Sequence, residues 1–175
     1  MRFFIKCFSV FATASLISCG GGGGNAEGGS GNTAATVASI EILTSATSLA
    51  SADNTTGVTV SAVVKDSSNN ALASQPLVFS ASSGILGGVA ATTGADGRAT
   101  AKLTAGTDRS NRDIVLTVKS AGITKTAVLP VTGTTLSASG ATSVLAGTVG
   151  NFAVSVRDSS GSPVAGVPVK VSSTL

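Results

Sequence analysis

The amino-acid sequence predicts an all-β protein: an antiparallel β-sandwich repeated in tandem, with the second copy incomplete, preceded by a signal peptide and a flexible linker. Short segments beyond residue 37 alternate apolar and polar side chains, which is typical of strands with one buried and one solvated face. Clusters of Gly, Asn, Asp and Ser separate these segments, and such residues favour turns. A stretch of the chain also recurs at a fixed offset of 92 residues, which takes Asp66 to Asp158.

Residues 1–18 are predicted to be a secretion signal. The segment begins with two basic residues and continues with a short apolar run, as secretory signals do. The run is shorter than the roughly 20 residues that span a bilayer, so a transmembrane helix is not expected. The segment closes with Leu16, Ile17, Ser18 and Cys19, which resemble the lipobox of bacterial lipoprotein signals.

The lipobox resemblance implies a lipid anchor. In bacterial lipoproteins the cysteine thiol receives the lipid and the signal is cut just before it. We therefore expect Cys19 to be lipidated and the chain to be held on a membrane of the cell envelope by fatty acyl chains such as palmitate. Gly20 stands where lipoproteins of the inner membrane typically have Asp, so in a Gram-negative organism the resemblance implies the outer membrane or cell surface. An ordinary signal with an incidental cysteine is the alternative.

Residues 19–36 form the predicted tether. Cys19 is followed by five glycines and then by a stretch rich in Gly, Asn and Ser. Such a segment cannot form a core and behaves as a flexible coil. About 15 residues of this kind reach roughly 20 Å, which separates a folded domain from the lipid headgroups.

Three segments carry the clearest strand pattern. Residues 58–65, residues 98–104 and residues 114–118 each place apolar side chains at every second position. The residues expected to face the core are Val58, Val60, Ala62, Val64, Ala99, Ala101, Leu103, Ile114, Leu116 and Val118.

The internal repeat gives the domain length. Residues 65–80 align without a gap on residues 157–172, and the apolar positions before them keep their alternation. A repeat of about 90 residues built from short strands fits tandem Ig-like sandwiches. We therefore expect one seven-stranded Ig-like domain at residues 37–133 and a partial one at residues 134–175. Two unrelated β-segments of similar composition are the alternative.

The turns also resemble a known family. Residues 69–79 and 161–171 are similar to the "G-x-P-x-x-G-x-x-V-x-F" segment of bacterial Ig-like domains of group 1, the repeats of intimin- and invasin-type adhesins. Residues 93–104 are similar to that family's "T-D-x-x-G-x-A-x-x-x-L-T" segment. The sequence departs from the usual pattern at Asn70, Ser74 and Gly94. The resemblance implies the fold, a spacer or adhesive role, and a protein or glycan ligand on a host or other cell surface.

The second copy stops before the repeat length is reached. Counterparts of residues 99–103 and 114–118 are missing. Two main strands cannot enclose a sandwich core, and their unpaired edges invite association. We therefore expect the chain to be the N-terminal piece of a longer protein, and the DNA downstream of the last codon would decide this.

Composition argues against several classes of function. The chain has no histidine, which removes Ser-His-Asp and Cys-His catalysis and His-ligated zinc. Both cysteines lie in the first 19 residues, so no disulfide is expected beyond them. Only Phe79 and Phe152 are aromatic after the signal, and no basic cluster is present, which argues against nucleic acid and against sugar stacking. No enzyme activity, cofactor or metal is expected.

Two polar features leave alternatives open. Calcium at domain junctions could use Asp96, Asp108, Asp113 or Asp158, but calcium takes six to eight oxygens and no D-x-D-x-D run is present. A turn-forming role is therefore favoured, in the turns that begin at Asp66, Asp96 and Asp158. The charged residues 109–113 are interpreted as a solvated loop, with a ligand-contact loop as the alternative.

The leading functional hypothesis is a non-catalytic, lipid-anchored surface protein whose repeats act as a stalk or adhesion module. The alternative is the N-terminal mounting region of a longer exported enzyme or binding protein whose active domain lies beyond residue 175. The abundance of Ala and Thr predicts a thin core and moderate stability.

Overall fold

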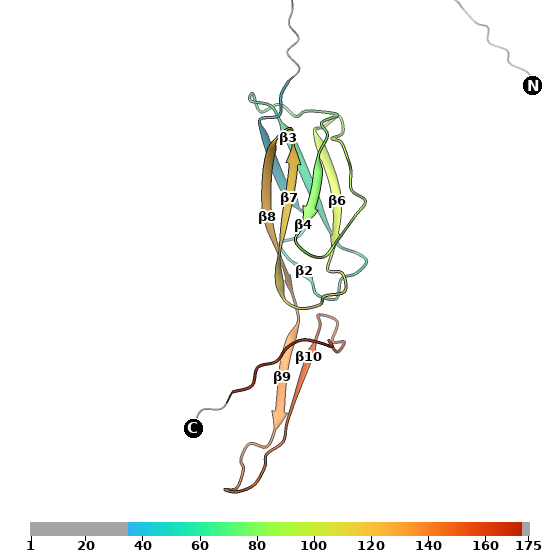
Figure 1. The fold of residues 1–175 in the computed structure, drawn as a ribbon. Coiled ribbons are helices and arrows are strands. Elements are labelled where there is room, and N and C mark those ends of the chain that lie inside the picture. Colours follow the sequence, from blue (N-terminus) through green and yellow to red (C-terminus); the bar gives the residue numbers. More distant parts are fainter. Residues whose placement is uncertain (1–34, 173–175) are drawn as a thin grey trace, which may run out of the picture. The chain divides into compact units, whose positions relative to one another are not determined.

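The computed structural model describes residues 35–172, in which β-strands are the only regular secondary structure (Figure 1). The strands are β1 (Ser39–Thr44), β2 (Leu49–Ala50), β3 (Val58–Lys65), β4 (Val78–Ala81), β5 (Ile85–Gly87), β6 (Arg98–Thr104), β7 (Arg112–Ser120), β8 (Ile123–Thr132), β9 (Thr135–Gly140) and β10 (Phe152–Arg157). Across residues 35–172 we find no helix of the length and apolar character needed to cross a membrane.

The first eight strands form a sandwich of two four-stranded sheets. One sheet has the order β1-β3-β6-β5 and the other the order β2-β8-β7-β4. Neighbouring strands are antiparallel, except that β2 runs parallel to β8 with Leu49 opposite Val131. The prediction of an all-β, Ig-like sandwich is confirmed.

The strand number differs from the expected seven because the first strand is divided. β1 pairs with β3 in one sheet, and β2 then pairs with β8 in the other sheet. A chain that switches sheets in this way ties together the edges of both layers. The sequence signal was weak because β2 contains only two residues.

The core fills the space between the two sheets. Every residue that the alternation pattern assigned to the core in β3, β6 and β7 is buried, with 5% or less of its surface exposed. Phe79 of β4 and Leu129 of β8 close the core from the second sheet. Burial of this apolar surface is the main source of the domain's stability.

The repeated turns adopt the same geometry in both copies. The N–H of Asp66 donates to the carbonyl of Asn70, and the N–H of Asp158 donates to the carbonyl of Ser162. The residue three positions after each aspartate has a positive φ, which is 66° at Asn69 and 81° at Gly161. The sequence analysis placed the family's glycine at Asn70, and this is corrected to Asn69. Asn69 holds the left-handed position of the turn, which an asparagine tolerates.

The second repeat contributes a two-stranded antiparallel sheet, β9 and β10. Leu136 of β9 lies opposite Val156, just as Ile40 of β1 lies opposite Val64 in the first copy. The hairpin therefore corresponds to β1 and β3 of the first domain, without a counterpart of the other strands in residues 35–172.

Candidate functional site at the repeat junction

The predicted anchor lies outside residues 35–172. Leu16, Ile17, Ser18 and Cys19 therefore stay a prediction. Within residues 35–172, polar side chains gather where the first domain meets the second repeat. The loop at residues 105–111 binds the turn at residues 158–162 and the β8–β9 link, and Ser51 binds the same turn. We call this set of contacts the repeat junction.

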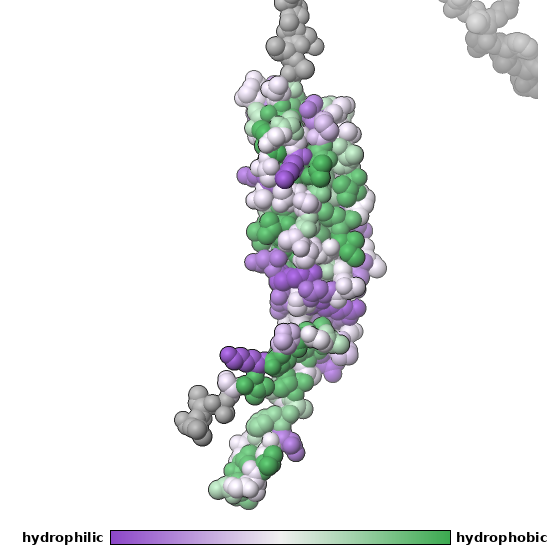
Figure 2. Space-filling model, viewed as in Figure 1, coloured by the Kyte–Doolittle hydropathy of each residue, from purple (hydrophilic) through white to green (hydrophobic). Residues whose placement is uncertain are grey.

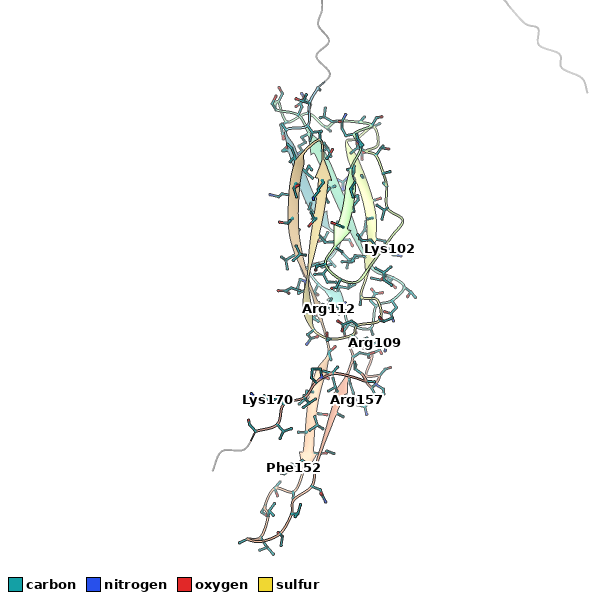
Figure 3. The ribbon with its side chains drawn as sticks, in the orientation of Figure 1. Lys102, Arg109, Arg112, Phe152, Arg157 and Lys170 are labelled. Carbon is teal, nitrogen blue, oxygen red and sulfur yellow. The ribbon has the colours of Figure 1, made fainter. Side chains whose placement is uncertain are left out.

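Asp158 is the buried centre of the repeat junction, with 3% of its surface exposed. Its Oδ1 accepts hydrogen bonds from the backbone N–H groups of Ser160 and Ser162, at 2.9 and 3.0 Å, and from the Ser160 hydroxyl at 2.7 Å. Its Oδ2 accepts from Nη1 of Arg109 at 2.5 Å. Figure 3 labels Arg109, which comes from the first domain. The carboxylate therefore holds its own turn and binds the neighbouring domain at once.

These donors set the protonation state of Asp158. The hydroxyl of Ser160 contributes most to lowering the pKa of the Asp158 carboxyl, and the backbone N–H groups of Ser162 and Ser160 and the Arg109 guanidinium lower it further, while burial acts in the opposite direction. The pKa lies below its ordinary value, so the group is a carboxylate at neutral pH.

Ser159 makes the second contact across the repeat junction. Its N–H donates to Oγ of the buried Ser51 at 3.0 Å, and its own Oγ accepts from the N–H of Ala52 at 2.9 Å. Gly133 permits this approach: its φ is +99°, and a Cβ at this position would lie 2.6 Å from Cβ of Ser159. Only glycine fits both requirements.

The loop that carries Arg109 is held in place by its neighbours. Asn111 binds Thr134 reciprocally: Nδ2 donates to the carbonyl and Oδ1 accepts from the N–H, both at 2.9 Å. Arg112 donates to the carbonyls of Ala105 and Asp108 at 2.8 and 2.6 Å. The Arg112 guanidinium thus stabilises the conformation of the loop at residues 105–111.

The structure changes the interpretation of the charged residues 109–113. A loop surrounded only by solvent was expected, but Arg109 pairs with Asp158 and Asn111 pairs with Thr134. Asp113 lies not in this loop but in β7, opposite Pro130. Alternation in the sequence could have placed Asp113 in the strand; no sequence signal indicated the partner of Arg109.

The other aspartates considered for calcium are separate from one another. Asp96 accepts from the N–H of Arg98 at 3.1 Å, and Asp108 accepts from the N–H and the hydroxyl of Ser110 at 2.9 and 2.7 Å. These are turn-stabilising contacts. Residues 35–172 contain no group of three or more His, Cys, Asp or Glu side chains that could hold a metal ion.

The fold and the repeat junction together define a class, that of a modular Ig-like β-sandwich protein. The family model for the bacterial Ig-like domain (group 1) matches residues 41–132, which is more than half of the chain, and the chain belongs to this family. The match covers the complete sandwich except for the first two residues of β1, and it stops at the last residue of β8.

Two solved structures resemble the chain. One is the D00-D0 domain of intimin, at 23% identity and a TM-score of 0.47, with 59% of this chain and 51% of that chain covered. The other is the Yersinia pseudotuberculosis adhesin InvE, at 20% identity and a TM-score of 0.49, with 74% of this chain and 43% of that chain covered. The chain thus spans about half or less of the length of these structures. No curated protein matches it.

Proposed function

We propose that the chain is a non-catalytic, lipid-anchored protein of the bacterial cell envelope whose Ig-like repeats act as a stalk or adhesion module. The observation that carries this proposal is the repeat junction. Arg109 and Asn111 on one side contact Asp158 and Thr134 on the other, so consecutive repeats are coupled by specific contacts and not only by a linker. A spacer needs such coupling to hold what it carries away from the membrane.

Family membership supports the same role. Two of the solved structures that resemble this chain are named as an intimin domain and an adhesin. We infer a partner on a host or other cell surface, either a protein or a glycan, for the adhesion form of the proposal. The stalk form needs no ligand for these repeats.

The stalk and adhesion forms are separated by one experiment on intact cells. Bacteria display the chain with a C-terminal epitope tag, either complete or without residues 37–133. If the repeats bind, the deletion lowers attachment to host cells. If they only space, attachment is unchanged but antibody access to the tag falls. A deletion that changes neither measurement would contradict the proposal.

The anchor is tested through the two cysteines. We infer that Cys19 carries the lipid, which holds the chain on the outer membrane or cell surface. Cys19→Ser should abolish incorporation of radiolabelled palmitate and release the chain from the membrane fraction. Cys7→Ser is the matched control, because it removes the other thiol and should leave the label in place. Label retained in Cys19→Ser would exclude this anchor.

A second candidate role rests on the same coupling of the repeats at the repeat junction, which would hold a further domain as well as it holds the second repeat. The repeats would then be the mount for an exported enzyme or binding domain encoded beyond residue 175. Sequencing the downstream DNA tests this directly, since an in-frame catalytic or binding domain favours the mount and an immediate stop codon contradicts it.

A further inference from the structure

The two repeats use the same aspartate turn in different ways. In both turns the Oδ1 atom of the aspartate accepts the N–H groups of the residues two and four positions later. The Oδ2 atom of Asp66 accepts from the side-chain amide of Asn70 at 3.1 Å, whereas that of Asp158 accepts from Arg109 of the first domain. The equivalent of Asn70 is Ser162, whose hydroxyl lies 3.1 Å from another serine hydroxyl of its turn. A serine at this position leaves Oδ2 available to a partner outside the turn.

The residue that precedes the first strand of each repeat differs in the same sense. The register of β1 with β3, and of β9 with β10, makes Ala38 equivalent to Thr134. The N–H of Ala38 donates to the carbonyl of Lys65 in its own domain, at 2.8 Å. The N–H of Thr134 instead donates to Oδ1 of Asn111 in the neighbouring domain, at 2.9 Å.

A third pair of equivalent residues, Val37 and Gly133, lies one position earlier. Val37 packs against the core of its own domain. Gly133 permits the close approach of Ser159, which binds the neighbouring domain. Three equivalent positions are therefore satisfied within their own domain in the first repeat and turned towards a neighbour in the second repeat.

The partners of the second repeat lie at the end of the first domain from which β8 leaves. Arg109 and Asn111 come from the loop at residues 105–111, and Ser51 and Ala52 follow β2. Figure 2 shows hydrophilic side chains gathered at this end of the first domain. This end is a docking surface, whereas the other end of the same domain is closed by its own side chains. A polar, self-satisfied end of this kind is what closes the terminal repeat of a modular array.

We propose that the side chain four positions after the turn aspartate selects which Ig-like repeats dock on the first domain. Serine at this position lets the aspartate bind Arg109. Asparagine carries an amide that donates to the same carboxylate oxygen, so it holds the aspartate within the turn and uncouples the repeat. Selection thus works by removing a competitor of Arg109, since specificity is a difference between affinities. This inference rests on the proposed stalk, which needs docked repeats.

Three backbone N–H groups report whether the repeat junction is closed. Those of Ala52, Thr134 and Ser159 each donate to a side chain on the other side of the junction. Their hydrogen exchange can be followed by NMR on the full chain with Cys7 and Cys19 replaced by Ser. Because exchange requires local opening of the junction, the three N–H groups should exchange slowly and together in this chain.

The test variant is Ser162→Asn, which gives the second repeat the residue of the first. It should accelerate exchange at all three N–H groups by about tenfold or more, because the new amide competes with Arg109 for the Asp158 carboxylate. Ser162→Ala is the matched control: it removes the hydroxyl without adding a donor, and exchange should stay within about twofold. Asn70→Ser makes the reverse change in the other turn and should leave the three N–H groups unaffected.

The outcomes separate this proposal from the proposed stalk. Exchange in Ser162→Asn within about twofold of the parent chain, or an equal acceleration in Ser162→Ala, would overturn selection by residue 162 and leave the stalk standing. Fast exchange of the three N–H groups already in the parent chain would overturn the coupling of the repeats, and both proposals with it. The N–H of Val64, which donates within the first domain, should exchange equally in every variant and reports that this domain stays folded.

Discussion

At the scale of single residues, Asp158 carries two roles in one carboxylate. One oxygen stabilises the turn that Asp66 also forms in the first copy, and the other oxygen binds Arg109. In the first copy the second oxygen of Asp66 instead accepts from the side-chain amide of Asn70, at 3.1 Å. The second carboxylate oxygen thus binds within the turn in the first repeat and binds the neighbouring domain in the second repeat.

Acidification should loosen the repeat junction. The pKa of Asp158 is lowered in the folded state, first by the Ser160 hydroxyl, so its contribution is fully present above the ordinary value of about 3.9 and is lost as the pH falls through the lower folded pKa. Spin labels at Lys102→Cys and Ser139→Cys, with Cys7 and Cys19 replaced by Ser, should give a narrow distance distribution at pH 7 that broadens below about pH 4.

The control for this acid effect is Asp158→Asn, which keeps an oxygen acceptor for the turn but loses the charge. Its distance distribution should be broad already at pH 7 and change little on acidification. Asp66→Asn should behave like the unmodified chain, since Asp66 pairs with no arginine within residues 35–172. The same narrow distribution in Asp158→Asn at pH 7 would contradict a coupling role for the ion pair.

Gly133 is the second residue on which the repeat junction depends. Gly133→Ala places a methyl group only 2.6 Å from Cβ of Ser159, so Ser159 must move and its contacts with Ser51 and Ala52 should be lost. Gly122→Ala is the matched control, because Gly122 also has positive φ, +82°, but nothing lies within 4 Å of its added Cβ.

The two glycine variants should change different properties of the protein. Gly122→Ala should lower the free energy of unfolding of the first domain by about 1–2 kcal/mol from left-handed strain and leave the spin-label distances unchanged. Gly133→Ala should broaden those distances. Equal distance distributions for both variants would show that the close approach of Ser159 is not needed.

At the scale of the strands, the sequence predicts β3, β6 and β7 well because one face of each is buried and the other is solvated. β8 was not predicted, since its first half exposes most of its side chains on both faces and only Leu129 and Val131 are buried. β5 has three residues, too few for alternation to be recognised. Periodicity therefore identifies strands whose burial is regular, and misses short or irregular ones.

The central strands should carry the stability of the first domain. Leu103 of β6 is fully buried, so Leu103→Ala should lower the free energy of unfolding by about 2–5 kcal/mol, measured by urea denaturation. Leu145→Ala removes the same side chain at a position that is 79% exposed and should cost less than about 0.5 kcal/mol. Comparable losses of unfolding free energy in the two variants would mean that Leu145 makes stabilising contacts despite its exposure.

At the scale of the molecule, the repeat was visible in the sequence because turn residues at a constant offset can be compared directly. The repeat junction was not, because its partners are far apart in the chain: Arg109 and Asp158 are separated by 49 residues, and Ser51 and Ser159 by 108. Neither pair has a local pattern. The sequence predicted the two repeats, and the structure supplied the contacts between them.

The first domain should fold without the second repeat. Within residues 35–172, the buried apolar residues all belong to the first domain, between Ile40 and Val131. Residues 134–172 bind that domain through an ion pair and hydrogen bonds, which water can replace. A chain ending at residue 133 should therefore unfold cooperatively, with a Tm within a few degrees of that of the full chain. A loss of 1 kcal/mol corresponds to about 4–8 °C in a domain of this size. A fall of more than about 8 °C in calorimetry would show that the second repeat is part of the folding unit.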